Sequence, residues 1–209
     1  MTTIVPTITT DDRDVYAQQI HDWAQFSKRV HIDITDGKFA PSRTLNCNQL
    51  YWSGVTTEIH VMVEQPSEWV NQLVSLHPDL VILHAECQDK SRLSELFKYL
   101  KKFGIKVGLA LLPETQPDEV EDLIRIVDDV LIFAGHLGYQ GGEADLNQLK
   151  KVEQIKAINP IAIIEWDGGA NISNVKQISQ AGVDQINVGS AIARADNPAE
   201  AWKQLTLFR

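Results

Sequence analysis

The stretch Val30-His31-Ile32-Asp33-Ile34-Thr35-Asp36-Gly37 alternates apolar residues with residues that can bind metals or move protons. In an extended strand, successive side chains point to opposite faces, so His31 and Asp33 share one face and the two isoleucines share the other. A histidine nitrogen and a carboxylate oxygen side by side on a rigid strand can hold a divalent metal ion. The stretch therefore predicts a strand with one face for chemistry and one face for packing.

Strand-like apolar segments recur along the whole chain, and this stretch is the second of them. We expect strands at about 3–8, 29–35, 57–63, 80–84, 106–111, 129–134, 161–166 and 184–188. Most of the intervening segments have helical periodicity. In the segment 11–27, Val15, Ile20 and Trp23 are expected on the inward face, and Asn171 is expected to cap the helix before the last strand.

One link differs from the others. The segment 36–55 has no strong period, and it predicts a loop and a short helix that reach over one end of the fold. Elsewhere, strands alternate with helices, which implies parallel strands joined by crossovers. Eight such units predict an α/β fold, a single (β/α)₈ TIM barrel, as one domain over residues 1–209. An open doubly wound sheet is the main alternative, but no Gly-x-Gly-x-x-Gly follows the first strand.

The composition narrows the class of partner. The net charge is −9 and the isoelectric point about 5.1, which argues against binding to nucleic acid or to an anionic membrane surface. Two cysteines, Cys47 and Cys87, are too few for a disulfide framework and fit a reducing cytoplasm. The first residues do not read as a signal peptide, and every apolar run is too short to span a bilayer. We expect a cytoplasmic protein that binds a small molecule.

The residues that can do chemistry lie near predicted strand ends. In a barrel the active site is at the C-terminal ends of the strands. His31 and Asp33 lie near the end of the second strand, His60 lies in the third, and Asp167 ends the seventh. Four such ligands meeting at one end would form a metal site with room for substrate oxygens. Each also has an ordinary interpretation, because a strand histidine can be a hydrogen-bonded core residue and an aspartate before glycine can form a turn.

Glycines follow three neighbouring predicted strands. Gly168-Gly169 follows the seventh strand, Gly189-Ser190 follows the eighth, and Gly138 and Gly141 lie in the loop after the sixth. Unobstructed backbone amides at these positions can bind phosphate, and barrels commonly place a phosphate site after strands seven and eight. Any one of these glycine pairs alone would also fit an ordinary turn.

Several motifs together resemble those of the ribulose-phosphate 3-epimerase family. They are 31–41, read as HIDITDGKFAP, then 60–63 (HVMV), 84–86 (HAE), 108–115 (GLALLPET), 165–169 (EWDGG) and 189–192 (GSAI). The resemblance spans nearly the whole chain, and it implies a barrel that holds one catalytic divalent metal ion, either zinc, iron(II), manganese or cobalt. By position, the metal ligands it implies are His31, Asp33, His60 and Asp167.

The resemblance also implies an activity. Members interconvert D-ribulose 5-phosphate and D-xylulose 5-phosphate, a step of the pentose phosphate pathway, and they often form homo-oligomers. Two carboxylates can remove the proton on carbon 3 and return one to the opposite face, and by position these are Asp33 and Asp167. The metal would stabilise the charge that develops between the two steps. His60 would act through the metal or also touch the substrate, and Thr7 takes the place of a family serine.

Two further departures from the family pattern leave alternatives open. Thr35 replaces a methionine, and the loop 136–142, HLGYQGG, replaces N-P-G-F-G-G after the sixth strand. Within that loop, His136 is either a substrate contact or an ordinary loop residue. The alternatives are an epimerase of a six-carbon ketose phosphate such as allulose 6-phosphate, and an inactive barrel that only binds a phosphate ligand. The decarboxylases and aldolases related to orotidine-phosphate decarboxylase require a lysine at the position of Thr35, so the sequence argues against that class of enzyme.

Overall fold

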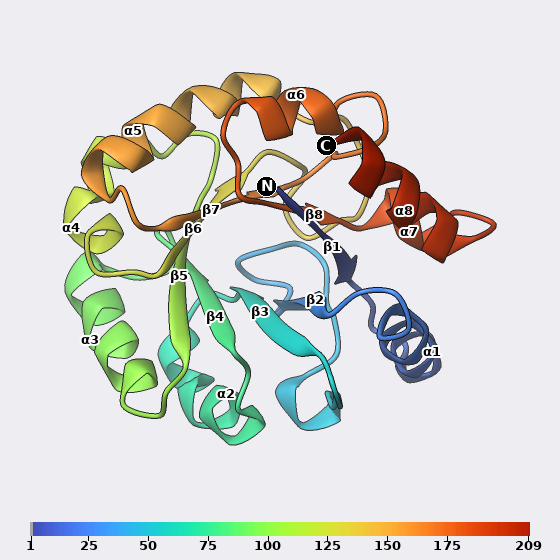
Figure 1. Cartoon of the computed structure of the whole chain (residues 1–209). Helices are drawn as coiled ribbons and strands as arrows, with labels where there is room; N and C mark the ends of the chain where they lie inside the picture. Colours follow the sequence, from blue (N-terminus) through green and yellow to red (C-terminus); the bar gives the residue numbers. More distant parts are fainter. Residues whose placement is uncertain (1) are drawn as a thin grey trace.

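A computed structural model describes residues 2–209, and its strands form a closed barrel (Figure 1). Each strand pairs in parallel with the next, and the last pairs with the first, Thr3 opposite Gln185. The strands are β1 (Thr3–Ile8), β2 (Arg29–Thr35), β3 (Thr56–Met62), β4 (Leu80–His84), β5 (Lys106–Leu111), β6 (Asp129–Phe133), β7 (Ile163–Asp167) and β8 (Gln185–Val188). The predicted TIM barrel is confirmed, and an open sheet is excluded because the ring is closed.

Helices surround the strands (Figure 1). The α-helices are α1 (Arg13–Trp23), α2 (Val70–Leu76), α3 (Lys90–Lys101), α4 (Glu121–Ile124), α5 (Lys151–Ile158), α6 (Val175–Gln180), α7 (Ser190–Ala193) and α8 (Pro198–Phe208). Four 3₁₀-helices are η1 (Cys47–Gln49), η2 (Pro66–Glu68), η3 (Pro117–Val120) and η4 (Leu146–Lys150). Among residues 2–209, no helix combines the length and apolar character that crossing a membrane would require.

Two local predictions were wrong. Val15 is 42% exposed, and Tyr16 is buried in its place, because α1 begins at Arg13 and turns the stripe of Tyr16, Ile20 and Trp23 toward the barrel. Asn171 does not cap α6, which begins four residues later at Val175. The Asn171 side chain instead accepts a hydrogen bond from the backbone N–H of Ser173, two residues on, in a turn before the helix.

The outer face of the barrel forms the main apolar core. Ile32 and Ile34 of β2 belong to one cluster with inward residues of the helices, such as Trp23 of α1 and Leu93 of α3. His31 and Asp33 alternate with these isoleucines along β2 and therefore point into the barrel, as the alternation predicts. Packing of the outer face fixes the direction of the chemical face.

The barrel interior has two unlike halves. The half on β4, β5 and β6 is mainly apolar and contains Leu80, Ile82, Ala110, Leu131 and Phe133, with His84 and Asp129 at the ends of β4 and β6 as its polar members. The other half is polar, and its buried members are His31, Asp33, Glu58, His60, Glu165, Gln185 and Asn187. Charged groups are buried only where other polar groups pair with them. Hydrogen bonds join one set of these side chains, His31, Glu58, Gln185, Asn187 and Glu165. Asp33 and His60 form a separate pair beside that set. The polar half carries the candidate site.

Candidate active site

Strand register brings four of the predicted residues together. Asp33 of β2 lies directly opposite His60 of β3. The Asp33 Oδ1 atom lies 3.2 Å from His60 Nδ1 and 3.4 Å from His31 Nε2. Asp167, at the end of β7, places Oδ2 3.4 Å from the same His60 Nδ1. One potential ligand atom from each of these four residues lies within 4.8 Å of the others, so the cluster has the size of a metal site.

The state of His31 fits such a cluster. Its Nδ1 atom lies 2.9 Å from Glu58 Oε1, and both side chains are fully buried. With a proton on Nδ1 donated to Glu58, the Nε2 atom is free to act as a ligand. Among residues 2–209, that buried Nε2 atom has no hydrogen-bond partner. Two imidazole nitrogens and two carboxylate oxygens are a donor set that suits zinc, iron(II), manganese or cobalt.

A second chain of hydrogen bonds leads away from His60. Its Nε2 atom lies 2.8 Å from His84 Nε2, and His84 Nδ1 lies 3.2 Å from Glu86 Oε2. The other Glu86 oxygen accepts hydrogen bonds from the Leu112 N–H, at 3.0 Å, and from the Thr115 hydroxyl. Glu86 can only accept as a carboxylate, so His84 donates from Nδ1 and accepts at Nε2. His60 then carries its proton on Nε2, which leaves Nδ1 free to face Asp33 and Asp167.

The electrostatics of the cluster favour positive charge. Burial alone would raise the pKa of Asp33, but the two neighbouring imidazoles, His31 and His60, outweigh burial and hold that pKa below its usual range. Burial lowers the pKa of each of these two imidazoles, yet the neighbouring carboxylates outweigh it and raise both pKa values. A site that holds protons this way also attracts a metal cation, because both respond to the same carboxylates.

A neighbouring buried group of His31, Glu58 and Glu165 is less suited to a metal. Glu58 is already paired with the Arg29 guanidinium at 2.9 Å, and it also accepts from Gln185. The His31 nitrogen on this side is the one that donates to Glu58. Burial and the charge of Glu58 raise the pKa of Glu165 well above its ordinary value, which favours its neutral form. This group is therefore a buried support beneath the first cluster.

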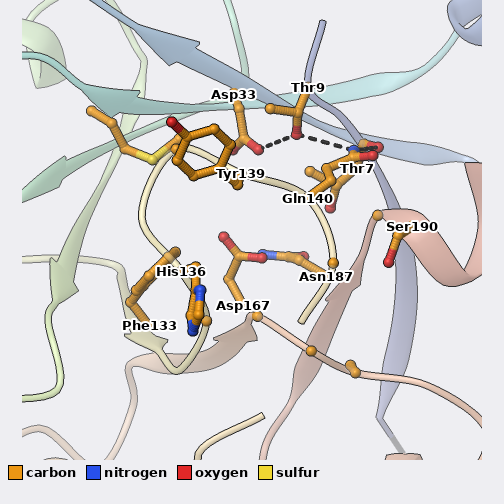
Figure 2. A pocket seen from close by; sticks show the side chains of 18 residues that line it. Thr7, Thr9, Asp33, Phe133, His136, Tyr139, Gln140, Asp167, Asn187 and Ser190 are labelled. Atoms are coloured by element: carbon orange, nitrogen blue, oxygen red, sulfur yellow. Dashed lines mark hydrogen bonds between the residues drawn. The ribbon is translucent and has the colours of Figure 1, made fainter. Parts of the chain in front are cut away.

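The two carboxylates open into a pocket at the C-terminal end of the barrel (Figure 2). Asp33 enters from β2 and Asp167 from β7. Other predicted site residues that line the pocket are Thr7, Gly138, Gly141, Gly168, Gly169, Gly189 and Ser190. His31 and His60 are fully buried beneath it and do not belong to its lining. His136 forms part of the wall, whereas Thr35 does not.

The glycines after β7 are also packing requirements. A Cβ atom on Gly168 would lie 2.2 Å from the backbone nitrogen of Gly135, and one on Gly169 would lie 2.3 Å from that of Ala144. Gly168 and Gly169 also have positive φ angles of 115° and 66°. The loops after β6 and β7 therefore meet backbone to backbone, which leaves peptide groups at the edge of the pocket.

Comparison with known proteins gives the family. Residues 3–193 match the model of the ribulose-phosphate 3-epimerase family. The chain belongs to this family. It is therefore an epimerase, an enzyme of carbohydrate metabolism, as its motifs predict.

Relatives in the epimerase family agree with the assignment. The chain is 33% identical over 172 residues to the ribulose-phosphate 3-epimerase of Helicobacter pylori strain J99, covering 78% of each protein. It is 31% identical to that of Encephalitozoon cuniculi, covering 85% of this chain and 80% of the relative. Among solved structures, orotidine 5'-monophosphate decarboxylase from Sulfolobus solfataricus superposes with a TM-score of 0.68 over all of this chain and 98% of its own, at 14% identity. That likeness concerns the fold alone.

Sequence reasoning missed three side chains in this epimerase pocket: Thr9, Gln140 and Asn187. The Thr9 hydroxyl donates to Asp33 Oδ2 at 2.5 Å, and Gln140 donates to Thr9 Oγ1 at 3.0 Å (Figure 2). Asn187 lies opposite Asp167 in the strand register. The sequence indicates Asn187 as a candidate site residue, because it is a polar residue between the apolar residues Ile186 and Val188 of β8. For Gln140 the only signal was its place in the loop that departs from the family motif.

Proposed function

We propose that the chain interconverts D-ribulose 5-phosphate and D-xylulose 5-phosphate by proton transfer at carbon 3, with Asp33 and Asp167 as the two acids. The observation that carries this proposal is the shared contact of both carboxylates with His60 Nδ1, from strands on either side of one pocket. Two acids at one pocket are what removal and return of a proton require. Family membership supports the reaction class.

In this mechanism one carboxylate removes the carbon 3 proton while the other holds a proton for the opposite face. The lowered pKa of Asp33 favours its charged form, which suits the role of base in one direction. In the reverse direction the roles of Asp33 and Asp167 exchange. The Thr9 hydroxyl holds one oxygen of the Asp33 carboxylate, and the other oxygen faces His60 Nδ1 at 3.2 Å. The carboxylates keep their spacing because Asp33 lies within β2, near its end, and Asp167 ends β7, and both strands belong to the closed ring.

One divalent metal ion, zinc, iron(II), manganese or cobalt, would be held by His31, Asp33, His60 and Asp167. When bound, it would supply positive charge that stabilises the negative charge developing on the substrate oxygens. The unpartnered His31 Nε2 atom supports this assignment. The residues on the far side of each imidazole, Glu58 and His84, orient the rings for it.

The phosphate end of the substrate would lie at the loops after β6, β7 and β8. Gly168, Gly169 and Gly189 bring peptide groups to the pocket edge, and Ser190 adds a hydroxyl. A Cβ on Gly141 would lie 3.7 Å from both Ser190 Oγ and the Arg194 guanidinium, so this corner also has a positive charge nearby. Gly138 and Thr7 complete the wall. His60, fully buried, would act on the substrate through the metal.

A six-carbon ketose phosphate is the second candidate substrate. The observation that favours it is the altered loop 136–142, whose residues His136, Tyr139 and Gln140 line the pocket directly. The presence of both carboxylates and both imidazoles in one cluster counts against a barrel that binds without turnover.

We also propose that one barrel domain spans residues 1–209.

Solvent deuterium exchange tests the proposal. Protein loaded with manganese, iron(II) or zinc is incubated with D-ribulose 5-phosphate in D₂O and followed by proton NMR. Deuterium at carbon 3 together with D-xylulose 5-phosphate is expected. Exchange without the new epimer would mean that only one acid works. No exchange with any metal would refute the pentose substrate, and the same assay would then be run with allulose 6-phosphate.

Asp167→Asn tests the assignment of the second acid. An amide cannot hold and release the proton, so we expect epimerisation to fall by about 100-fold or more. The fold is expected to remain, because Asp167 lies at the end of β7. Circular dichroism checks the fold and NMR checks turnover, with Asp196→Asn on the surface as the control. Near-normal turnover in Asp167→Asn would overturn the assignment.

A further inference from the structure

The loop after β6 crosses the pocket and bonds to the opposite side of the barrel. We call residues 135–143 the β6 loop. Its Gln140 side chain donates from Nε2 to the Thr7 carbonyl oxygen at 3.1 Å and to Thr9 Oγ1 at 3.0 Å (Figure 2). Thr7 lies in β1 and Thr9 follows its end directly, and β7 and β8 separate β1 from β6 in the ring. A single side chain thus joins the two sides of the pocket mouth.

The direction of these hydrogen bonds is fixed by chemistry. The Thr7 carbonyl can only accept, so the amide nitrogen of Gln140 must face β1. The Thr9 oxygen accepts from that nitrogen, and its one proton is then directed to Asp33 Oδ2, 2.5 Å away. The order of donors runs from Gln140 to Thr9 to Asp33. It links the loop directly to one of the two acids of the proposed reaction.

Asp33 has separate partners for its two oxygens. Oδ1 faces His60 at 3.2 Å and His31 at 3.4 Å. Among residues 2–209, the only hydrogen bond to Oδ2 is the one from Thr9. The Thr9 hydroxyl therefore fixes the rotation of the Asp33 carboxylate about its Cβ–Cγ bond, and Gln140 fixes the direction of the hydroxyl proton.

The β6 loop is held at further points, so that Gln140 is placed accurately. The Gln140 carbonyl accepts from Arg194 Nη2 at 3.4 Å. Its side chain also packs on Gly189, where an added Cβ would lie 2.9 Å from Gln140 Nε2. At the other end of the loop, a Cβ on Gly138 would lie 2.7 Å from Ser42 Oγ. The loop thus closes the pocket between the β2–β3 connection and the start of α7.

We propose that Gln140 is a positioning residue that couples closure of the β6 loop to the orientation of Asp33 through Thr9. The proposal rests on the proposed function, in which Asp33 exchanges a proton with the substrate. When the loop is closed, the donor chain holds the carboxylate for proton transfer. When the loop opens, Thr9 loses its donor and Asp33 loses its fixed orientation. Closure over the substrate and preparation of the acid become one event.

Two variants break the chain at different links. Gln140→Ala removes the donor, and Thr9→Val removes the hydroxyl with little change in volume. We expect either to lower kcat by about tenfold, since small errors in orientation are costly in proton transfer. KM is expected to change about twofold or less, because the phosphate contacts remain. Thr9→Ser, which keeps the hydroxyl, is expected to restore kcat, and Glu143→Gln, exposed in the same loop, is the control.

Two further measurements separate the coupling from a general structural effect. The double variant Thr9→Val/Gln140→Ala is expected to be no slower than the slower single variant, because both changes break one chain. Amide hydrogen exchange of peptides over 135–143 is expected to accelerate in Thr9→Val, although Thr9 lies outside the loop. Multiplicative losses in the double variant, or unchanged loop exchange in both single variants, would overturn the proposal. The exchange measurement needs no turnover, so it tests the coupling even if the wild type does not epimerise the pentose.

Discussion

At the scale of single residues, Glu86 sets the tautomer of His60 through the intervening imidazole of His84. Glu86 accepts on both oxygens, which forces His84 to donate toward it and to accept from His60. The Nδ1 atom of His60 is thereby kept free on the side of Asp33 and Asp167. In the neutral form that can bind a metal ion, each imidazole of this chain has one proton and one free lone pair, so Glu86 acts by selecting the tautomers.

Glu86→Gln should reverse this chain. The Leu112 N–H and the Thr115 hydroxyl both need an acceptor, so the new amide would turn its oxygen toward them and its NH₂ group toward His84. The proton of His84 would then move to Nε2 and that of His60 to Nδ1. We expect the affinity for manganese or zinc to fall by about 10- to 100-fold, measured by titration calorimetry. Glu114→Gln, exposed on the loop that contains Leu112, should bind metal like the wild type.

The parts of the site that the sequence predicts are those on a regular strand. Alternation along β2 predicts that His31 and Asp33 share a face, and the end of β7 predicts the place of Asp167. Thr9 and Gln140 escape this reasoning, because they lie 131 positions apart in the chain and meet only where a loop crosses the barrel. Glu86 escapes it as well, because its effect passes through the tautomer of another residue.

At the scale of elements, helix starts show which residues stabilise the frame. Asp12 caps α1, and its Oδ1 atom accepts from the N–H groups of Asp14 at 2.8 Å and Val15 at 3.2 Å. Asp89 caps α3 in the same way through Arg92. In contrast, α6 begins without a side-chain cap. The starts of α1 and α3 are therefore stabilised by side-chain hydrogen bonds as well as by packing.

Asp12→Ala should lower the free energy of unfolding by about 1 kcal/mol, because two N–H groups at the helix start lose their acceptor. Asp11→Ala is the matched control, since it removes the same charge from the neighbouring exposed position. Urea denaturation followed by circular dichroism measures both. Equal losses in the two variants would assign the effect to charge rather than to the cap.

The strands were predictable to within about two residues, because their apolar patterns end at turn residues. The prediction was less accurate at helix starts, where it misjudged which residues face the barrel. Periodicity alone placed Val15 inward, whereas the cap at Asp12 sets the phase of α1 and turns Tyr16 inward. The Tyr16 hydroxyl then donates to the Tyr51 carbonyl at 2.7 Å, a contact with the 36–55 link that no local pattern specifies. Partners of this kind come from tertiary structure.

At the scale of the whole molecule, the barrel interior carries more buried acid than base. Glu58, Glu165 and Asp129 approach one another below the cluster of His31, Asp33, His60 and Asp167, and the Arg29 guanidinium pairs with Glu58. Burial and the charge of Glu58 raise the pKa of Asp129 from 3.8 to about 6, against the opposing effects of Glu165, Arg29 and Lys106. The folded protein therefore binds a proton here that the unfolded chain releases at a lower pH.

Asp129→Asn should change how stability depends on pH. The raised pKa of Asp129 means that its contribution is fully present below pH 3.8 and is lost as the pH rises through about 6. That shift corresponds to about 3 kcal/mol, so the variant should gain about this much relative to the wild type between pH 4 and pH 7. Denaturation curves at several pH values give the difference. In the control Glu153→Gln, on the exposed face of α5, the free energy of unfolding should depend on pH as it does in the wild type.

The pairing of β8 with β1 has a consequence for how the protein is made. During synthesis, Asp33 and His60 leave the ribosome early, and Asp167 follows before β8 exists. The ring closes only when residues near 185 find residues near 3, a contact between distant parts of the chain that makes folding slow. All four residues of the cluster are therefore present in a nascent chain that cannot yet hold them at a common distance. Competence for metal binding should arise late and abruptly, when the final strand completes the circle.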